Sequence, residues 1–361
     1  MNVDEIRKNF PVLDRYTYLN TPSSGVLHKD IYEWRRDYDR TFMEGGSTFR
    51  DHIIEDIQSV KAQVAKTFHG DQERIALISN FSIGANIIFD SLPKEMSVLT
   101  LQGDYPSLLL PIQSRGFKQH EVPLFMLSEA AIAEAIRDED VDVLAVSMTQ
   151  WVTGFHLKTD FFQRLKIDFP NLIIIVDGTQ SLGTAPFNFD TSGIDILITS
   201  AYKWLISGYG CGFMMFSERV WDFLDVRYIG NATVMTRMFS DFKNEAQTIE
   251  PGHLDYLAFG TMKRAIAYLD QLGLDKIERE ISKVSLHAKT QLVHLGYLSP
   301  KVLGGAIHRN IIHFLGSEQL VNFLKEHNIL VSYRQGLRIG IHFYNTEGDI
   351  NQFLKAIRVF R

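Results

Sequence analysis

Residues 194–216 read IDILITSAYKWLISGYGCGFMMF, and they carry the clearest signs of how this chain folds. Two apolar runs, 194–200 and 212–216, have the length and the aliphatic content of buried strands. Strands that are apolar on both faces belong in a sheet covered by helices on both sides. Lys203 stands between the two runs, and a turn with three glycines follows it. A lysine at a strand end is either a solvated charge or an amine with a chemical role, and both interpretations stay open here.

The same pattern extends outward from this stretch. Further strands are expected at 75–79, 97–102, 141–148 and 172–177, with helices at 52–68, 82–92, 106–116 and 159–168. Buried strands that alternate with helices predict an α/β domain with a mostly parallel sheet and helices on both faces.

The pattern changes after about residue 255. A long helix is expected at 255–272 and helical spacing from 277, followed by a strand at 310–316, a helix at 317–328, strands at 329–334 and 337–344, and a last helix from Asp349. This order is typical of a compact α+β module. We therefore expect a large domain over 15–255 and a smaller α+β domain formed by 1–14 and 256–361.

Composition excludes several classes of function. The chain has 361 residues, 45% hydrophobic and 22% charged, with a formal charge of -6 and no block of like charges, so we expect neither a nucleic-acid nor a membrane partner. The start, MNVDEIRKNF, lacks the apolar core of a signal peptide, and the run LIIIV at 172–176 is too short to span a bilayer. Cys211 is the single cysteine, which excludes an intramolecular disulfide and a thiolate metal cluster. We expect a soluble cytoplasmic protein without a metal.

Polar residues stand where the expected strands end. Ligands in open α/β sheets bind at the carboxyl ends of the strands. Asp177 and Gln180 follow the strand at 172–177, and Lys203 follows the strand at 194–200. A helix starts near Ser82, and Tyr105 follows the strand at 97–102. We expect these side chains to face one crevice.

A carboxylate, an amine, a helix start and an aromatic ring together match what pyridoxal phosphate needs. A deprotonated lysine condenses with the aldehyde of the cofactor, and an ionised aspartate keeps the ring nitrogen of the cofactor protonated. A helix N-terminus suits the phosphate, and an aromatic side chain stacks on the ring. Each residue alone is more simply a helix cap, a core aromatic or a solvated strand end, so the prediction rests on the ordered combination.

At these residues the sequence resembles the class V aminotransferase group of pyridoxal-phosphate enzymes, which includes cysteine desulfurases, kynureninases and isopenicillin-epimerase-like proteins. The motifs that carry the resemblance are YTYLNTPSSG (16–25), VDGTQSLG (176–183), DILITSAYKWL (195–205), IEPGHLDYLAFG (249–260) and LRIGIHFYNTEGDI (337–350). The resemblance implies a fold-type-I architecture with a seven-stranded-type sheet and a small C-terminal domain. It also implies a homodimer with its active site near the subunit interface.

The resemblance further implies roles for single residues. Lys203 forms the internal aldimine and then carries the proton, Asp177 pairs with the pyridinium nitrogen, and Gln180 bonds the ring oxygen beside the imine. Tyr105 stacks on the ring. The phosphate ligands implied are Phe81 through its N–H, Ser82, Ser200 and Tyr202, with His253 reaching the phosphate of a neighbouring subunit.

Two residues are expected to bind the amino-acid substrate. Arg338 takes the substrate carboxylate through its planar guanidinium, although an ion pair that locks the domains together is the simpler alternative. Asn20 lies near the N-terminal substrate segment of the family. Gln150 and Trp151 align loosely, and they either shape the substrate pocket or pack.

Departures from the family bear on the reaction. Desulfurases carry a histidine just before the lysine, where this chain has Tyr202, as kynureninase-like sequences do. The segment SYRQGLRIG at 332–340 is short and lacks the desulfurase cysteine, and Cys211 is wrongly placed for that role. The resemblance therefore favours an aminotransferase over a persulfide-forming desulfurase. A kynureninase-like hydrolase or a β-eliminating C–S lyase is the alternative, with an epimerase after it. The intact site residues argue against a cofactor-binding protein without turnover, and the missing dinucleotide fingerprint argues against a dehydrogenase.

Overall fold

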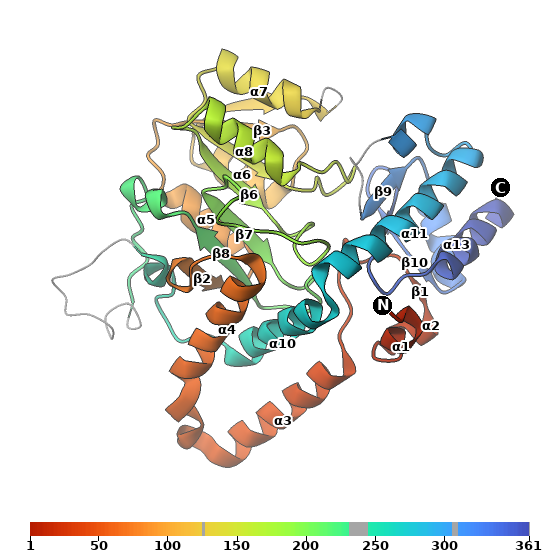
Figure 1. Ribbon diagram of the computed structural model, residues 1–361, viewed down its shortest axis with the longest axis horizontal. Coiled ribbons are helices and arrows are strands. Elements are labelled where there is room, and N and C mark those ends of the chain that lie inside the picture. Colours follow the sequence, from red (N-terminus) through yellow and green to blue (C-terminus); the bar gives the residue numbers. More distant parts are fainter. Residues whose placement is uncertain (125–126, 231–244, 305–309, 361) are drawn as a thin grey trace.

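A seven-stranded sheet forms the centre of the molecule in this computed structural model, which describes residues 1–124, 127–230, 245–304 and 310–360 (Figure 1). The strand order is β2-β8-β7-β6-β5-β3-β4. The strands are β2 (Ile75–Ile78), β3 (Ser97–Leu101), β4 (Lys118–Val122), β5 (Val143–Ser147), β6 (Ile173–Asp177), β7 (Ile196–Ser200) and β8 (Gly212–Phe216). Only β8 runs against its neighbours, so the expectation of a mostly parallel α/β sheet is confirmed.

Two hydrophobic cores cover the two faces of this sheet. Alternate residues along β6 point to opposite sides: Ile174 and Val176 join one core, and Ile173 and Ile175 join the other. The first core contains α4 (Ile53–Phe68), α7 (Glu129–Asp138), α8 (Thr159–Asp168) and α10 (Tyr256–Leu272), and the second contains α5 (Phe81–Ser91) and α6 (Pro106–Ser114). This burial on both faces explains why six of the seven strands, all except β4, are buried along their whole length.

One edge strand was missed by sequence reasoning. The strand β4 reads KQHEV, has Val122 as its one buried residue and, in the seven-stranded sheet, pairs with β3 alone. Polar and charged residues are common on edge strands because they discourage pairing with other chains. Hydrophobic periodicity therefore gave no signal for β4.

The C-terminal part contains a three-stranded antiparallel sheet in the order β11-β12-β9. Its elements are α11 (Leu274–His294), β9 (Ile311–Phe314), α12 (Glu318–Glu326), β10 (Ile329–Leu330), β11 (Ser332–Tyr333), β12 (Leu337–Gly340) and α13 (Glu347–Phe360). In Figure 1 this part, coloured blue, lies beside the part that contains the large sheet. No helix among the described residues is both long and apolar enough to cross a membrane.

The N-terminal chain connects the two parts. It forms α1 (Val3–Arg7), α2 (Val12–Arg15), β1 (Thr17–Tyr18) and α3 (Lys29–Gly45). Strand β1 pairs in parallel with β10 of the C-terminal part, whereas α10 packs against α3 and α4. The expected division of the chain at residues 14 and 255 remains a prediction, but these contacts place β1 with the C-terminal part, in a two-stranded sheet with β10, and α10 with the large core.

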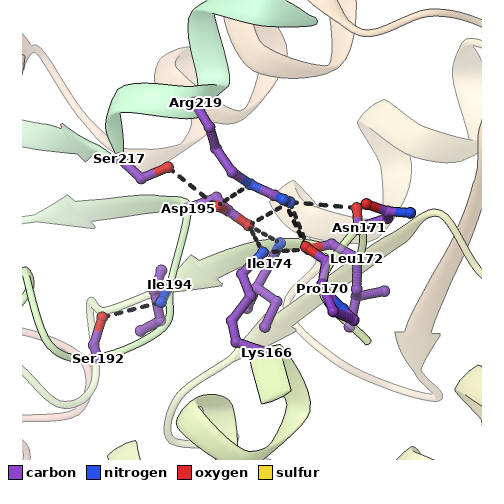
Figure 2. Close-up of polar contacts among 10 residues, drawn as sticks. All are labelled: Lys166, Pro170, Asn171, Leu172, Ile174, Ser192, Ile194, Asp195, Ser217 and Arg219. Atoms are coloured by element: carbon purple, nitrogen blue, oxygen red, sulfur yellow. Dashed lines mark hydrogen bonds and ion pairs between the residues drawn. The ribbon is translucent and has the colours of Figure 1, made fainter. Parts of the chain in front are cut away.

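A buried carboxylate, Asp195, joins the strands β6, β7 and β8 at the end of β7 that is far from Lys203. Figure 2 shows its contacts. Asp195 immediately precedes β7 and is 2% exposed. It accepts hydrogen bonds from the Ile174 backbone N–H in β6 at 2.9 Å and from Ser217 Oγ, just after β8, at 3.0 Å. Lys166 Nζ and Arg219 Nε donate to it at 2.5 and 2.8 Å. The hydrogen bonds from Ile174 and Ser217 hold the starts of β6 and β7 and the end of β8 together, and the two cations balance the charge of Asp195.

Candidate active site

Lys203 and Asp177 share a buried site at the carboxyl edge of the sheet. Asp177 is the last residue of β6, Lys203 follows the end of the neighbouring strand β7, and both side chains are buried. Burial lowers the pKa of the Lys203 amine to about 8, although the nearby Asp177 opposes this shift. Burial also raises the pKa of Asp177 to about 6, against the hydrogen bonds from Thr179 and the charge of Lys203. The site therefore holds an amine that is neutral in part near pH 8 and a carboxylate that is ionised above about pH 6.

Two tyrosine rings flank the Lys203 amine. Its Nζ lies 5.5 Å from the centroid of the Tyr105 ring and 5.4 Å from that of Tyr202. The Tyr202 ring in turn stacks on Tyr209 with centroids 4.7 Å apart. Among the described residues, no hydrogen bond from Lys203 Nζ is found, so the amine is free for a covalent partner. The structure thus brings three of the expected residues, Lys203, Tyr105 and Tyr202, into contact.

The start of α5 supplies hydroxyl and backbone donors. Asn80 caps this helix by accepting from the Ile83 N–H at 3.1 Å. The Phe81 N–H donates to Ser200 Oγ at 2.8 Å, which joins the helix start to the end of β7. Ser82 Oγ donates to Ser107 Oγ at 2.8 Å. The expected phosphate ligands Phe81, Ser82 and Ser200 therefore lie together.

Sequence reasoning missed Ser107. It is the second residue of α6, the helix that Tyr105 precedes and that begins at Pro106. Its hydroxyl meets Ser82 at the start of α5, so two helix N-termini converge where an anion is favoured. The only sequence signal was the order Tyr-Pro-Ser, since proline is common in the first turn of a helix.

The Gln180 side chain is held at both ends. Its Oε1 accepts from Trp204 Nε1 at 2.7 Å, and its Nε2 donates to the Pro22 carbonyl at 3.1 Å. His342 Nε2 donates to the Trp204 carbonyl at 2.9 Å, and burial lowers the pKa of His342 to about 3, so this imidazole is neutral. One N–H of the Gln180 amide remains for a ligand. Trp204 and His342 were not expected from the sequence.

Arg338 is a buried cation for which the described part of the chain supplies no anion. Its side chain is 1% exposed and donates to Ser332 Oγ at 3.0 Å, the Trp151 carbonyl at 2.6 Å and Ser23 Oγ at 3.0 Å. No ion pair of Arg338 is present among the described residues, so the domain-locking ion pair finds no support there. Burial, aided by the charge of Arg334, lowers the pKa of Arg338 to about 9. A buried guanidinium is costly without an anion, which makes an anionic ligand favourable here.

The N-terminal segment 20–25 closes over the lysine loop. The Gly25 N–H donates to the Tyr202 carbonyl at 2.8 Å. A Cβ at Gly25 would lie 2.1 Å from the Lys203 carbonyl oxygen, so only glycine permits this approach. Asn20 Oδ1 is buried and has no hydrogen-bond partner within the described chain. An unpaired buried oxygen beside this site suits a ligand that donates a hydrogen bond.

His253 is exposed and lies just before α10, which begins at Tyr256. Its expected contact is with the phosphate bound to a neighbouring subunit, and this role remains a prediction. No group of three or more histidine, cysteine, aspartate or glutamate residues suited to a metal is found in the described part of the chain.

Comparisons with known sequences give one family. The family model described as aminotransferase class-V matches residues 26–353. An uncharacterized aminotransferase of Bacillus subtilis, YcbU, is 18% identical, over 98% of this chain and 97% of that protein. A probable cysteine desulfurase of Ureaplasma parvum is 19% identical, over 93% of this chain and 90% of that protein.

Solved structures share the fold. A variant of C-DES with glycine covalently linked to its PLP cofactor has a TM-score of 0.89 at 19% identity, covering 97% of this chain and 98% of that one. C-DES is a cystine C–S lyase, and its complex with cysteine persulfide has a TM-score of 0.87 at 19% identity, covering 96% and 98%. An apo cysteine desulfurase from Thermococcus onnurineus has a TM-score of 0.87 at 18% identity, covering 99% and 97%.

Proposed function

We propose that this chain, which belongs to the aminotransferase class-V family of pyridoxal-phosphate-dependent enzymes, transfers the amino group of an α-amino acid to a keto acid. Its cofactor is pyridoxal 5'-phosphate. The observation that carries the proposal is the Lys203 amine, which is buried beside Asp177 with its pKa lowered to about 8. A lysine in this state both attacks a carbonyl and removes a proton near neutral pH.

The residues present fit the cofactor. Pyridoxal phosphate supplies an aldehyde for an amine and a ring that withdraws electrons from the substrate. Lys203 would hold it covalently, and Asp177 would hold a protonated ring nitrogen, whose charge would offset the desolvation of this carboxylate. Tyr105 would lie against the ring, and Ser82 and Ser200, at the start of α5, would bind the phosphate.

The remaining residues bind and orient the substrate. Arg338 would take the α-carboxylate with N–H groups that its contacts to Ser332, Trp151 and Ser23 leave free. Those three contacts fix the direction of the guanidinium and hence the face of Cα that Lys203 meets. Lys203 would remove the proton at Cα and return it at another carbon. The segment 20–25 contacts the lysine loop through the hydrogen bond from the Gly25 N–H to the Tyr202 carbonyl.

A β-eliminating C–S lyase is the second candidate. The likeness to C-DES, a cystine C–S lyase, favours this reaction. The reaction also needs no cysteine of the enzyme in the site. A persulfide-forming desulfurase needs a reactive cysteine, but Cys211 is 1% exposed and shares a hydrogen bond with Ser207 Oγ at 3.2 Å. Burial raises the pKa of the Cys211 thiol to about 11, which disfavours the thiolate.

We also propose, on family grounds, that the enzyme acts in the cytoplasm as a homodimer. In that assembly His253 would reach the site of the partner subunit. Size-exclusion chromatography with light scattering tests the assembly, and a monomer with full activity would refute it.

A panel of amino acids tests the reaction. Purified holoenzyme should be yellow, and borohydride should fix the cofactor to Lys203. Lys289, on α11, is the control, because burial also lowers its pKa to about 8. Label on Lys289 instead, or no chromophore after reconstitution, would contradict the assignment of Lys203.

The products separate the candidate reactions. Transamination predicts loss of the yellow absorbance with one keto acid formed, and recovery of the colour on adding a second keto acid. Pyruvate with ammonia from a sulfur amino acid supports the C–S lyase. Anthranilate from kynurenine supports a kynureninase-like hydrolase, and inversion at Cα without a keto product supports an epimerase.

A further inference from the structure

A tight hairpin constrains the backbone at Arg334, which lies close to the candidate active site. The turn connects β11 to β12, and the Arg334 N–H donates to the Gly336 carbonyl at 2.8 Å. His313 Nε2 donates to the Arg334 carbonyl at 3.0 Å. Gly336 has φ of 154°, and a Cβ there would lie 2.6 Å from His313 Nε2. The backbone from which the Arg334 side chain extends is thus constrained by glycine and by β9.

Ring contacts connect the Arg334 side chain to the surroundings of Lys203. Its Cζ lies 5.9 Å from the centroid of the Trp151 ring, and so does the Cζ of Arg338. The Trp151 ring meets the Tyr105 ring edge to face, with centroids 5.8 Å apart. Tyr105 in turn flanks Lys203. The Trp151 ring is therefore a neighbour both of the ring that flanks the lysine and of the two guanidinium groups.

Neither guanidinium group meets a carboxylate in the part of the chain that the structure describes. Among the described residues, neither Arg334 nor Arg338 forms an ion pair. The charge of Arg334 contributes, after burial, to the lowered pKa of both Lys203 and Arg338. The ring contacts agree with this, because they join the three cations through Tyr105 and Trp151. One substrate carboxylate can satisfy Arg338, and the charge on Arg334 is then left without an anion.

We propose that Arg334 binds a second carboxylate, at the end of the substrate side chain, so that the enzyme prefers acidic α-amino acids to their neutral counterparts. This inference rests on the proposed function, because it assigns the α-carboxylate to Arg338. Arg334 is exposed, so binding a carboxylate costs it little desolvation, and Trp151 provides a surface for its guanidinium. Arg334 is thus a specificity-determining residue of this site.

Spectral titration of the yellow holoenzyme tests the inference through dissociation constants. The probes are L-aspartate against L-asparagine, L-glutamate against L-glutamine, and L-2-aminoadipate against L-norleucine, with L-alanine as a reference. In at least one pair the acid should bind about tenfold more tightly, as for a charge-assisted hydrogen bond to a partly exposed group. The preference should fall as salt concentration rises, because an exposed charge is screened.

The matched variants are Arg334→Gln, Arg334→Lys and Arg137→Gln. Arg334→Gln should abolish the preference for the acid, so that each acid binds no more tightly than its neutral counterpart, and Arg334→Lys should retain part of the preference. Arg137 is an exposed arginine whose Cζ lies 5.8 Å from the Phe169 ring, far from the site in α7, so its replacement should change neither value.

Two results would overturn the inference alone. One is equal affinity for acids and neutral counterparts in the unaltered enzyme, and the other is an acid preference that survives Arg334→Gln. A holoenzyme that responds to no amino acid, L-alanine included, would overturn the proposed function and this inference together.

Discussion

Replacing Asp195 by asparagine should destabilise the protein without disturbing the candidate active site. In Figure 2 every group that contacts this carboxylate donates a hydrogen bond to it: Lys166, Arg219, the Ile174 N–H and the Ser217 hydroxyl. Asparagine keeps the shape, but its NH₂ group would face one of these donors, and the two cations would lose their anion.

The magnitude follows from burial. Removing one member of a buried ion pair costs about 3–5 kcal/mol. The side chains of Lys166 and Arg219 are 20% and 35% exposed, and they would regain some hydration. We therefore expect about 2–3 kcal/mol for Asp195→Asn. With about 2.1 cal/mol/K of unfolding entropy per residue over 361 residues, this loss lowers the melting temperature by about 3–4 °C.

Calorimetry of cofactor-saturated protein measures this shift. Asp190→Asn is the control, because Asp190 lies near the same edge of the sheet but is 52% exposed and 3.8 Å from Arg74 NH2. The control should cost less than about 0.5 kcal/mol. The yellow absorbance of both variants should equal that of the unaltered enzyme, since Lys203 is at the other end of β7. A shift for Asp195→Asn no larger than that of the control would refute the reasoning.

Three further predictions concern the site. Because burial lowers the pKa of Lys203 to about 8, the fraction of Lys203 in the neutral form increases as pH rises. The rate of cofactor incorporation should therefore rise about tenfold per pH unit below 8 and then level off. A rate that does not depend on pH would contradict this. Arg338→Ala should weaken amino-acid binding by about 10- to 100-fold in spectral titrations while the cofactor stays bound, and the reverse pattern would show that the carboxylate assignment is wrong. Cys211→Ala should keep turnover within about twofold in steady-state assays, because a buried thiol serves packing, and loss of activity would point back to a persulfide mechanism.

Much of the fold could be predicted because its signals are local. The run at 212–216 is the strand β8 with the same bounds, and the helix at 159–168 is α8 with the same bounds. Their residues are contiguous and strongly apolar or periodic. In contrast, β4 has a polar sequence and is a strand only because it pairs with β3, so no local pattern marks it.

The candidate chemistry at the strand ends could be predicted from the order of residues alone. Asp177 and Lys203 each follow a run of buried aliphatic residues, and parallel strands bring their carboxyl ends to one edge. That relation needs only the order of strands and residues along the chain.

The contacts of the groups around this chemistry could not be predicted, because they join residues far apart in the sequence. Arg338 meets Ser23 and Trp151, residues far from it in sequence, and no carboxylate joins them among the described residues. The same packing brings Arg334 against Trp151 and Ser107 against Ser82. Such contacts depend on how separate elements pack, and periodicity within one element carries no information about them.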